Sequence, residues 1–87
     1  MNHNKEKNRF EEKLQNELAI IEYNLNNNIF DLYHTEVPEA LQGKGIATKL
    51  VREVLGYLKK QGYKVKPSCP FIADYIAENT EFERLVV

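Results

Sequence analysis

The sequence predicts an α/β fold: a mixed, mainly antiparallel sheet of about five strands with two helices. Three segments rich in β-forming residues follow one another in the first half and are separated by short turns. A long amphipathic segment, preceded by a proline and a glycine loop, has the periodicity of a helix. A short apolar segment then returns the chain to the sheet, and the crossover rule makes it parallel to the strand before the helix.

The length of the chain limits the number of domains, and its net charge limits the kinds of partner. The chain has 87 residues and a net charge of −1 at pH 7, so we expect one domain with a thin core, without general attraction for nucleic acid or an acidic membrane. No apolar run is long enough to cross a bilayer. A single cysteine excludes an internal disulfide and a multi-cysteine zinc site. A cytoplasmic protein without a metal, monomeric or a weak homodimer, is therefore expected.

The first half of the chain predicts three antiparallel strands. Residues 1–8 are polar and have no apolar period, so they are expected to be a flexible leader before a single domain over residues 9–87. Strands are predicted over 9–14, 18–25 and 29–37, with turns at 15–17 and at the asparagines 26–28. Alternation in the third strand places Phe30, Leu32 and His34 on one face, and Asp31, Tyr33 and Thr35 on the other.

The second half predicts two helices and a short strand. Pro38 ends the third strand because proline cannot donate to a ladder. Residues 46–61 form the clearest helix, and Gly62 stands where a left-handed cap belongs. A short strand follows over 63–66, and a second helix over 70–79 begins with Pro70 at a favoured position. Residues 81–87 are expected to form a closing turn or strand. The apolar side chains expected on the two helices are Ile46, Ala47, Leu50, Val51, Val54, Leu55, Leu58, Phe71, Ile72, Tyr75 and Ile76.

The loop before the first helix predicts an anion site. Gly43 and Gly45 allow backbone conformations that side chains disfavour, and Lys44 adds a mobile positive charge. The start of a helix presents free N–H groups and a positive dipole end to an anion. The spacing does not match a Walker phosphate loop or a dinucleotide fingerprint. The alternative is a strand-to-helix turn that needs glycine for its geometry alone.

Residues 42–47, Gln-Gly-Lys-Gly-Ile-Ala, resemble the acetyl-CoA signature of the GNAT superfamily of N-acyltransferases. The segments 34–38 before the loop and 66–71 after the helix add to this resemblance, which runs from about residue 18 to residue 79. The whole set resembles the minimal, single-domain GNAT-like N-acetyltransferases. Unlike larger GNAT enzymes, the chain lacks the N-terminal helices that build an acceptor pocket, it has no clear tyrosine at the usual general-acid position, and Cys69 stands where many members have asparagine.

The resemblance implies a curved sheet in which coenzyme A lies where two parallel strands splay apart. Pantetheine is then expected to pair with the backbone at Glu36 and Val37, while the pyrophosphate takes N–H groups from the loop. The basic residues of the first helix (Lys49, Arg52, Lys59, Lys60) are expected to form its solvated face; the alternative is that some of them reach the 3′-phosphate of CoA. The residues that this assigns to acetyl-CoA or CoA are Val37, Gln42, Gly43, Lys44, Gly45, Ile46 and Ala47.

Three side chains are candidates for the chemistry. Cys69 stands at a helix N-terminus, where it could accept the acyl group or donate a proton to the departing CoA thiolate; the alternative is an inert buried cysteine. His34 could act as the general base for an amine, or be a core histidine. Glu36 could hold the acceptor amine or position a water, or be a solvated strand residue.

These observations predict an acetyl-CoA-dependent N-acyltransferase that moves an acetyl group to an amine acceptor, either a small molecule or a protein. One alternative is a non-catalytic module or sensor that binds CoA or acetyl-CoA. Another is a small interaction domain whose glycine loop is only structural.

Overall fold

The computed structural model describes all 87 residues and has one five-stranded sheet with the order β1-β2-β3-β4-β5. The first four strands pair antiparallel in chain order, and β5 pairs parallel with β4. The predicted fold class, with its parallel pair, is therefore confirmed. The strands are β1 (Asn2–Asn4), β2 (Arg9–Leu14), β3 (Glu17–Asn26), β4 (Ile29–Glu36) and β5 (Lys64–Lys66).

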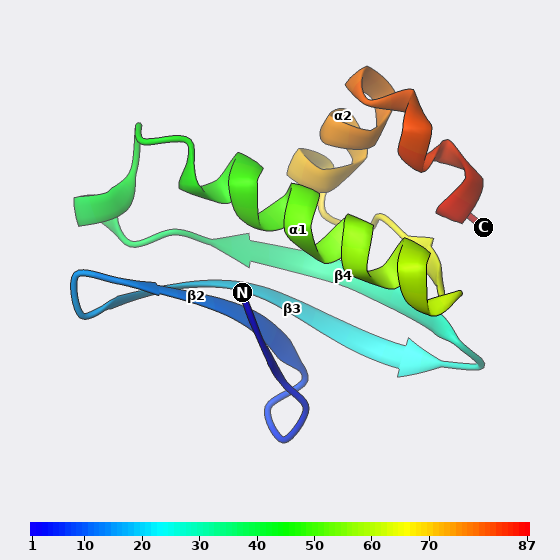
Figure 1. Cartoon of the computed structure of the whole chain (residues 1–87), viewed down its shortest axis with the longest axis horizontal. Helices are drawn as coiled ribbons and strands as arrows, with labels where there is room; N and C mark the ends of the chain where they lie inside the picture. The colour runs from blue at the N-terminus through cyan, green and yellow to red at the C-terminus, as the bar shows by residue number, and fades with distance from the viewer.

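Two main helices, α1 (Ile46–Gln61) and α2 (Pro70–Glu78), follow the antiparallel strands. Two short 3-10 helices, η1 (Glu39–Leu41) and η2 (Thr80–Leu85), precede α1 and follow α2; the sequence did not predict η1. Figure 1 shows α1 lying along one face of the sheet, with α2 beside it. None of the helices combines the length and apolar character that crossing a membrane requires.

The core lies between α1 and the sheet. Nineteen buried residues form a single cluster. To this cluster α1 contributes the predicted stripe except Ala47, which is half-buried, and Leu50, Val54 and Leu58 have no exposed surface. The predicted bounds of α1 are confirmed. Gly62 has a φ of 82° and its N–H donates to the carbonyls of Leu58 and Lys59, which is the left-handed cap expected at this position.

The N-terminal segment differs from the predicted flexible leader. Residues 2–4 form β1, antiparallel to β2, with His3 opposite Phe10. The two rings stack with their centroids 4.3 Å apart, and His3 Nε2 lies 2.7 Å from the Tyr23 hydroxyl. The domain therefore includes β1 and does not begin at residue 9. A three-residue strand with one inward ring has no apolar period, so the sequence pattern missed it.

A β-bulge in β4 overturns the predicted alternation of its side chains. Leu32 pairs with Tyr23, whereas His34 pairs with Glu22, so Tyr33 is an extra residue without a partner. The bulge moves His34 to the face opposite Leu32 and brings Thr35 to the face that packs against the helices. The prediction that His34 shares a face with Phe30 and Leu32 is therefore wrong.

The C-terminal segment combines the turn and the strand that the sequence left open. After η2, Val86 forms a parallel bridge with Val65, and the Val87 N–H donates to the Val65 carbonyl at 3.1 Å. In α2, Ile72 and Ile76 are buried as predicted, but Phe71 is 42% exposed and does not belong to the core.

Candidate functional site

The two parallel strands separate soon after they pair. Residues 29–31 of β4 pair with residues 64–66 of β5, and the Cys69 N–H then donates to the Leu32 carbonyl at 2.9 Å. Past this bond, β4 continues toward Val37 without a strand on its β5 side. That edge of β4 is therefore not paired with another strand.

The loop that follows β4 is held against the end of that strand. Gln42 Nε2 donates to the Val37 carbonyl at 3.1 Å, which closes the turn around η1. Gly43 and Gly45 have φ values of 78° and 73°. This is the left-handed backbone conformation that residues with a side chain disfavour, as predicted for this loop. A Cβ added at either glycine would meet no atom within 4 Å, so backbone conformation, and not space, requires glycine here.

The start of α1 presents a row of free backbone donors. The N–H groups of residues 43–48 have no acceptor on the backbone or on a side chain, and the first bonded one, that of Lys49, donates to the Gly45 carbonyl at 3.0 Å. Gly45 is the N-cap residue and offers no side-chain cap. Free donors at the positive end of a sixteen-residue helix are the geometry that favours an anion.

A cavity of about 220 Å³ lies beside these donors. It brings together six of the seven residues predicted to bind the cofactor; Lys44 is exposed in the loop and does not line it. The sequence missed Leu41, Thr48 and Phe71. Leu41 and Phe71 are apolar residues near helix starts, which are usually assigned to the core, and Thr48 is a polar residue of the kind usually assigned to a solvated helix face. The lining residues are Val37, Leu41, Gln42, Gly43, Gly45, Ile46, Ala47, Thr48 and Phe71.

A second cavity of about 370 Å³ adjoins the first, because Thr48 and Phe71 line both. It lies between α1 and α2, and Arg52 is the only basic residue in its lining. Lys49 lies instead on the surface, with its Nζ 3.9 Å from a Glu53 carboxylate oxygen. The other lining residues of this cavity are Asp74, Tyr75, Glu78 and Asn79.

Cys69 is the N-cap residue of α2, at the point where β4 and β5 separate. Its side chain is 7% exposed and belongs to the core cluster. The sulfur lies 3.5 Å from Thr35 Oγ1 and does not line the first cavity, although Phe71, two residues further on, does. The structure thus places the thiol next to the cavity wall and not in the cavity itself.

The two other candidates for the chemistry lie on the opposite face of the sheet. His34 pairs with Glu22 and Glu36 pairs with Ile20, and both side chains are exposed. Because Thr35, between them, faces the helices, the structure does not bring His34 or Glu36 together with Cys69. Their proposed roles remain predictions.

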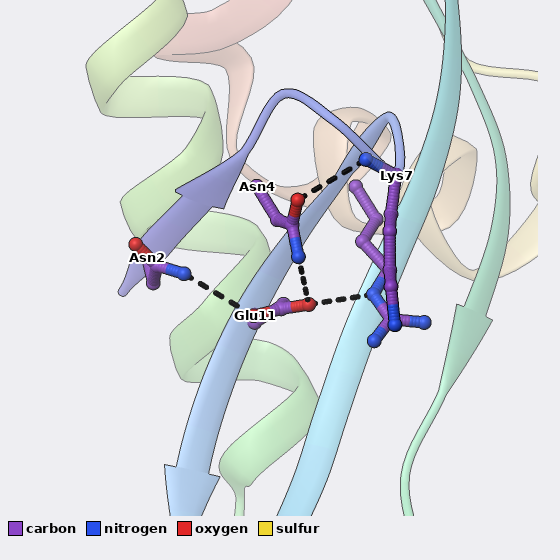
Figure 2. A network of polar contacts seen from close by, with 5 residues as sticks. Asn2, Asn4, Lys7 and Glu11 are labelled. Carbon is purple, nitrogen blue, oxygen red and sulfur yellow. Dashed lines mark hydrogen bonds and ion pairs between the residues drawn. The ribbon is translucent and has the colours of Figure 1, made fainter.

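The ionisable groups with shifted pKa values lie around the N-terminal strands and away from the loop. On the outer face of the sheet, Glu11 accepts hydrogen bonds from Arg9, Asn2 and Asn4, with α1 behind the strands (Figure 2). The bond from Arg9, 2.6 Å long, is the main reason that the pKa of the Glu11 carboxyl is lowered, and the two amides add to it against the opposing effect of burial.

On the inner face of the sheet at the same end, the pKa values of His3 and Tyr23 are also shifted. Burial lowers the pKa of His3, and the charge of Lys5 adds to this effect. Burial also raises the pKa of the Tyr23 hydroxyl, with contributions from Tyr57 and Tyr63. These groups pack β1 onto the sheet, and none of them lines the cavity at the start of α1.

Comparison with known families agrees with this geometry. Residues 9–85 match the family described as GCN5-related N-acetyl-transferase. The chain therefore belongs to the GCN5-related N-acetyltransferase family, and the resemblance noted in the sequence is confirmed.

Relatives and solved structures extend the comparison. A stretch of 51 residues, 59% of this chain, is 41% identical to Protein NATD1 of Gallus gallus, Mus musculus and Homo sapiens. The match covers 46% of the chicken and mouse proteins and 45% of the human one, so the chain spans about half the length of these curated relatives. The fold is also that of a GCN5-like protein from Staphylococcus aureus, with a TM-score of 0.66 and 22% identity over 92% of this chain and 89% of the other.

Proposed function

We propose that the protein binds acetyl-CoA at the start of α1 and transfers the acetyl group to an amine. The observation that carries this proposal is the row of unpaired N–H groups at residues 43–48 beside a cavity and a free strand edge. A diphosphate supplies the negative oxygens that such donors require. The free edge of β4 near Val37 is a pairing surface for the amide groups of pantetheine, and Arg52 in the adjoining cavity is the cation available to a 3′-phosphate.

Cys69 is the residue proposed for the chemistry, in one of two ways. Its thiolate attacks the thioester carbonyl, so that a new S–C bond forms, the bond to the CoA sulfur breaks, and CoA leaves as a thiol after taking up a proton. The amine then attacks the acetyl carbonyl, so that an N–C bond forms and the bond to the Cys69 sulfur breaks, and the proton that the amine loses returns to that sulfur. Alternatively, the amine attacks the thioester directly and the Cys69 thiol gives its proton to the departing CoA thiolate.

One arrangement favours a different function, namely a sensor that binds CoA or acetyl-CoA without turnover. The first cavity is lined by no histidine, carboxylate or cysteine, and His34 and Glu36 lie on the far face of the sheet. A site that holds the ligand but offers no acid or base to it suits binding alone.

Calorimetry with CoA and acetyl-CoA tests the binding site. We expect wild-type protein to bind both, and Gly45→Val to lose about tenfold or more in affinity because its backbone φ of 73° is strained for a branched residue. Gly62→Ala is the matched control: its φ is 82°, nothing lies within 4 Å of an added Cβ, and it stands at the other end of α1. Wild-type protein that binds neither ligand would overturn the proposal.

Intact mass spectrometry after incubation with acetyl-CoA tests the chemistry, with Cys69→Ala as the control. An acetyl adduct that is absent from the variant indicates the covalent route. Release of free CoA only when a polyamine or a lysine peptide is added, without an adduct, indicates direct transfer. Binding with neither outcome supports the sensor.

A further inference from the structure

The bulge in β4 determines which side chain of this strand meets the thiol. Without the extra residue at Tyr33, regular alternation would place His34 on the face toward the helices. With it, Thr35 is opposite Ile21, a core residue without exposed surface, and points to the same face. A bulge at this place in the strand thus exchanges an imidazole for a hydroxyl beside Cys69.

The backbone of Cys69 is fixed on both sides. Its N–H donates to the Leu32 carbonyl at 2.9 Å, and its own carbonyl accepts from the N–H groups of Ile72 and Ala73 at 3.1 and 3.0 Å. Only the rotation of the side chain is then left to determine where the sulfur points. The Thr35 hydroxyl, 3.5 Å away, makes the one hydrogen bond of that sulfur.

We propose that Thr35 is a positioning residue for Cys69. Its hydroxyl donates a hydrogen bond to the sulfur, holds the side chain toward the gap between β4 and β5, and stabilises the thiolate when the proton leaves. The inference rests on the proposed function, in which Cys69 does the chemistry. Thr35 itself does not line either cavity at the start of α1, so it acts through the sulfur and not by contact with CoA.

Charged groups on the neighbouring elements do not replace this bond. On β4, His34 and Glu36 point to the other face of the sheet; on β5, Lys66 is exposed. The first turn of α2 has no acidic residue, and Asp74 lines the second cavity. Among side chains, the Thr35 hydroxyl is therefore the polar group within hydrogen-bond distance of the sulfur.

Two substitutions separate the hydrogen bond from packing. Thr35→Val keeps the shape of the side chain and removes the hydroxyl, whereas Thr35→Ser keeps the hydroxyl and removes a methyl group. Since the chain has one cysteine, the ultraviolet absorbance of the thiolate, measured against pH and corrected with Cys69→Ala, reports this sulfur alone and needs no CoA. We expect the thiolate to form at higher pH in Thr35→Val, with about three- to tenfold less of it at neutral pH, and Thr35→Ser to follow the wild type.

Acetylation by acetyl-CoA provides the second measurement. Thr35→Val is expected to slow acetyl transfer to Cys69 by about the same factor while the affinity for CoA stays the same. Identical titration curves for wild type and both variants would overturn the role of Thr35, as would equal losses in the valine and serine variants, which would indicate packing alone. If wild-type protein neither binds CoA nor becomes acetylated, the proposed function fails, and the titration still decides what Thr35 does to the thiol.

Discussion

The N-terminal strands and the start of α1 differ in how many of their polar groups are hydrogen-bonded. Five of the nine hydrogen bonds that involve side chains belong to residues 2–11, and they satisfy the Glu11 carboxylate with three donors. At residues 43–48, by contrast, the backbone N–H groups have no partner. The N-terminal strands thus pair most of their polar side chains, although His3 Nδ1 is buried without a partner. The start of α1 leaves its backbone donors free, which is the arrangement that suits an anion.

The largest effect that this comparison predicts is on stability, from Phe10→Ala. Phe10 is completely buried and stacks on His3, so we expect the variant to lose about 3–5 kcal/mol in the free energy of unfolding. Denaturant unfolding measures this loss. Phe10→Leu, with a smaller loss, keeps enough folded protein to measure CoA affinity by calorimetry. A weaker affinity for CoA in Phe10→Leu would show that the N-terminal strands and the start of α1 are not independent.

Glu11→Gln should have a smaller effect of the same kind. The amide cannot accept the charge-assisted bond from Arg9 as well as the carboxylate does, and we expect a loss of about 1–2 kcal/mol in unfolding free energy. Glu22→Gln, on the same outer face of the sheet but without a hydrogen bond of its side chain, is the matched control. Equal losses in the two variants would show that the network adds no stability.

Acidification should weaken the N-terminal region in two steps. The folded-state pKa of His3 lies below its usual 6.5 and that of Glu11 below its usual 4.5, so the unfolded chain binds protons that the folded chain does not. Stability is therefore full above pH 6.5, falls first through His3 and then, below pH 4.5, through Glu11. Thermal unfolding at a series of pH values measures both steps, and His3→Phe should remove only the first. An unchanged first step in that variant would assign it to another group.

The smallest effect is expected at the loop. Gln42→Ala removes the bond from Gln42 Nε2 to the Val37 carbonyl, which is exposed and adds about 1 kcal/mol or less. We expect CoA affinity to fall about two- to fivefold, because the amides are less well held, and the unfolding midpoint to change little. Calorimetry and thermal unfolding on the same sample measure the two quantities. A large fall in the unfolding midpoint of Gln42→Ala with unchanged affinity for CoA would show that Gln42 serves stability and not binding.

Some site residues were predictable because their signals are local. Gly43 and Gly45 lie in the left-handed region that glycine favours, and they precede a helix whose apolar period is complete within its own sixteen residues. The same local reasoning failed at Phe71, because the period of a nine-residue helix does not separate a core position from the wall of a cavity.

The sequence by itself determined α1, its C-terminal cap at Gly62, the glycine loop before the helix and the order of β2, β3 and β4, since each depends on neighbouring residues. The tertiary structure alone decided the bulge at Tyr33, the docking of β1 through His3, and the contact between Thr35 and Cys69. These depend on strand register, and a shift of one residue moves every later side chain to the other face. Register is chosen by the partner strand and the core, which no single segment of sequence contains.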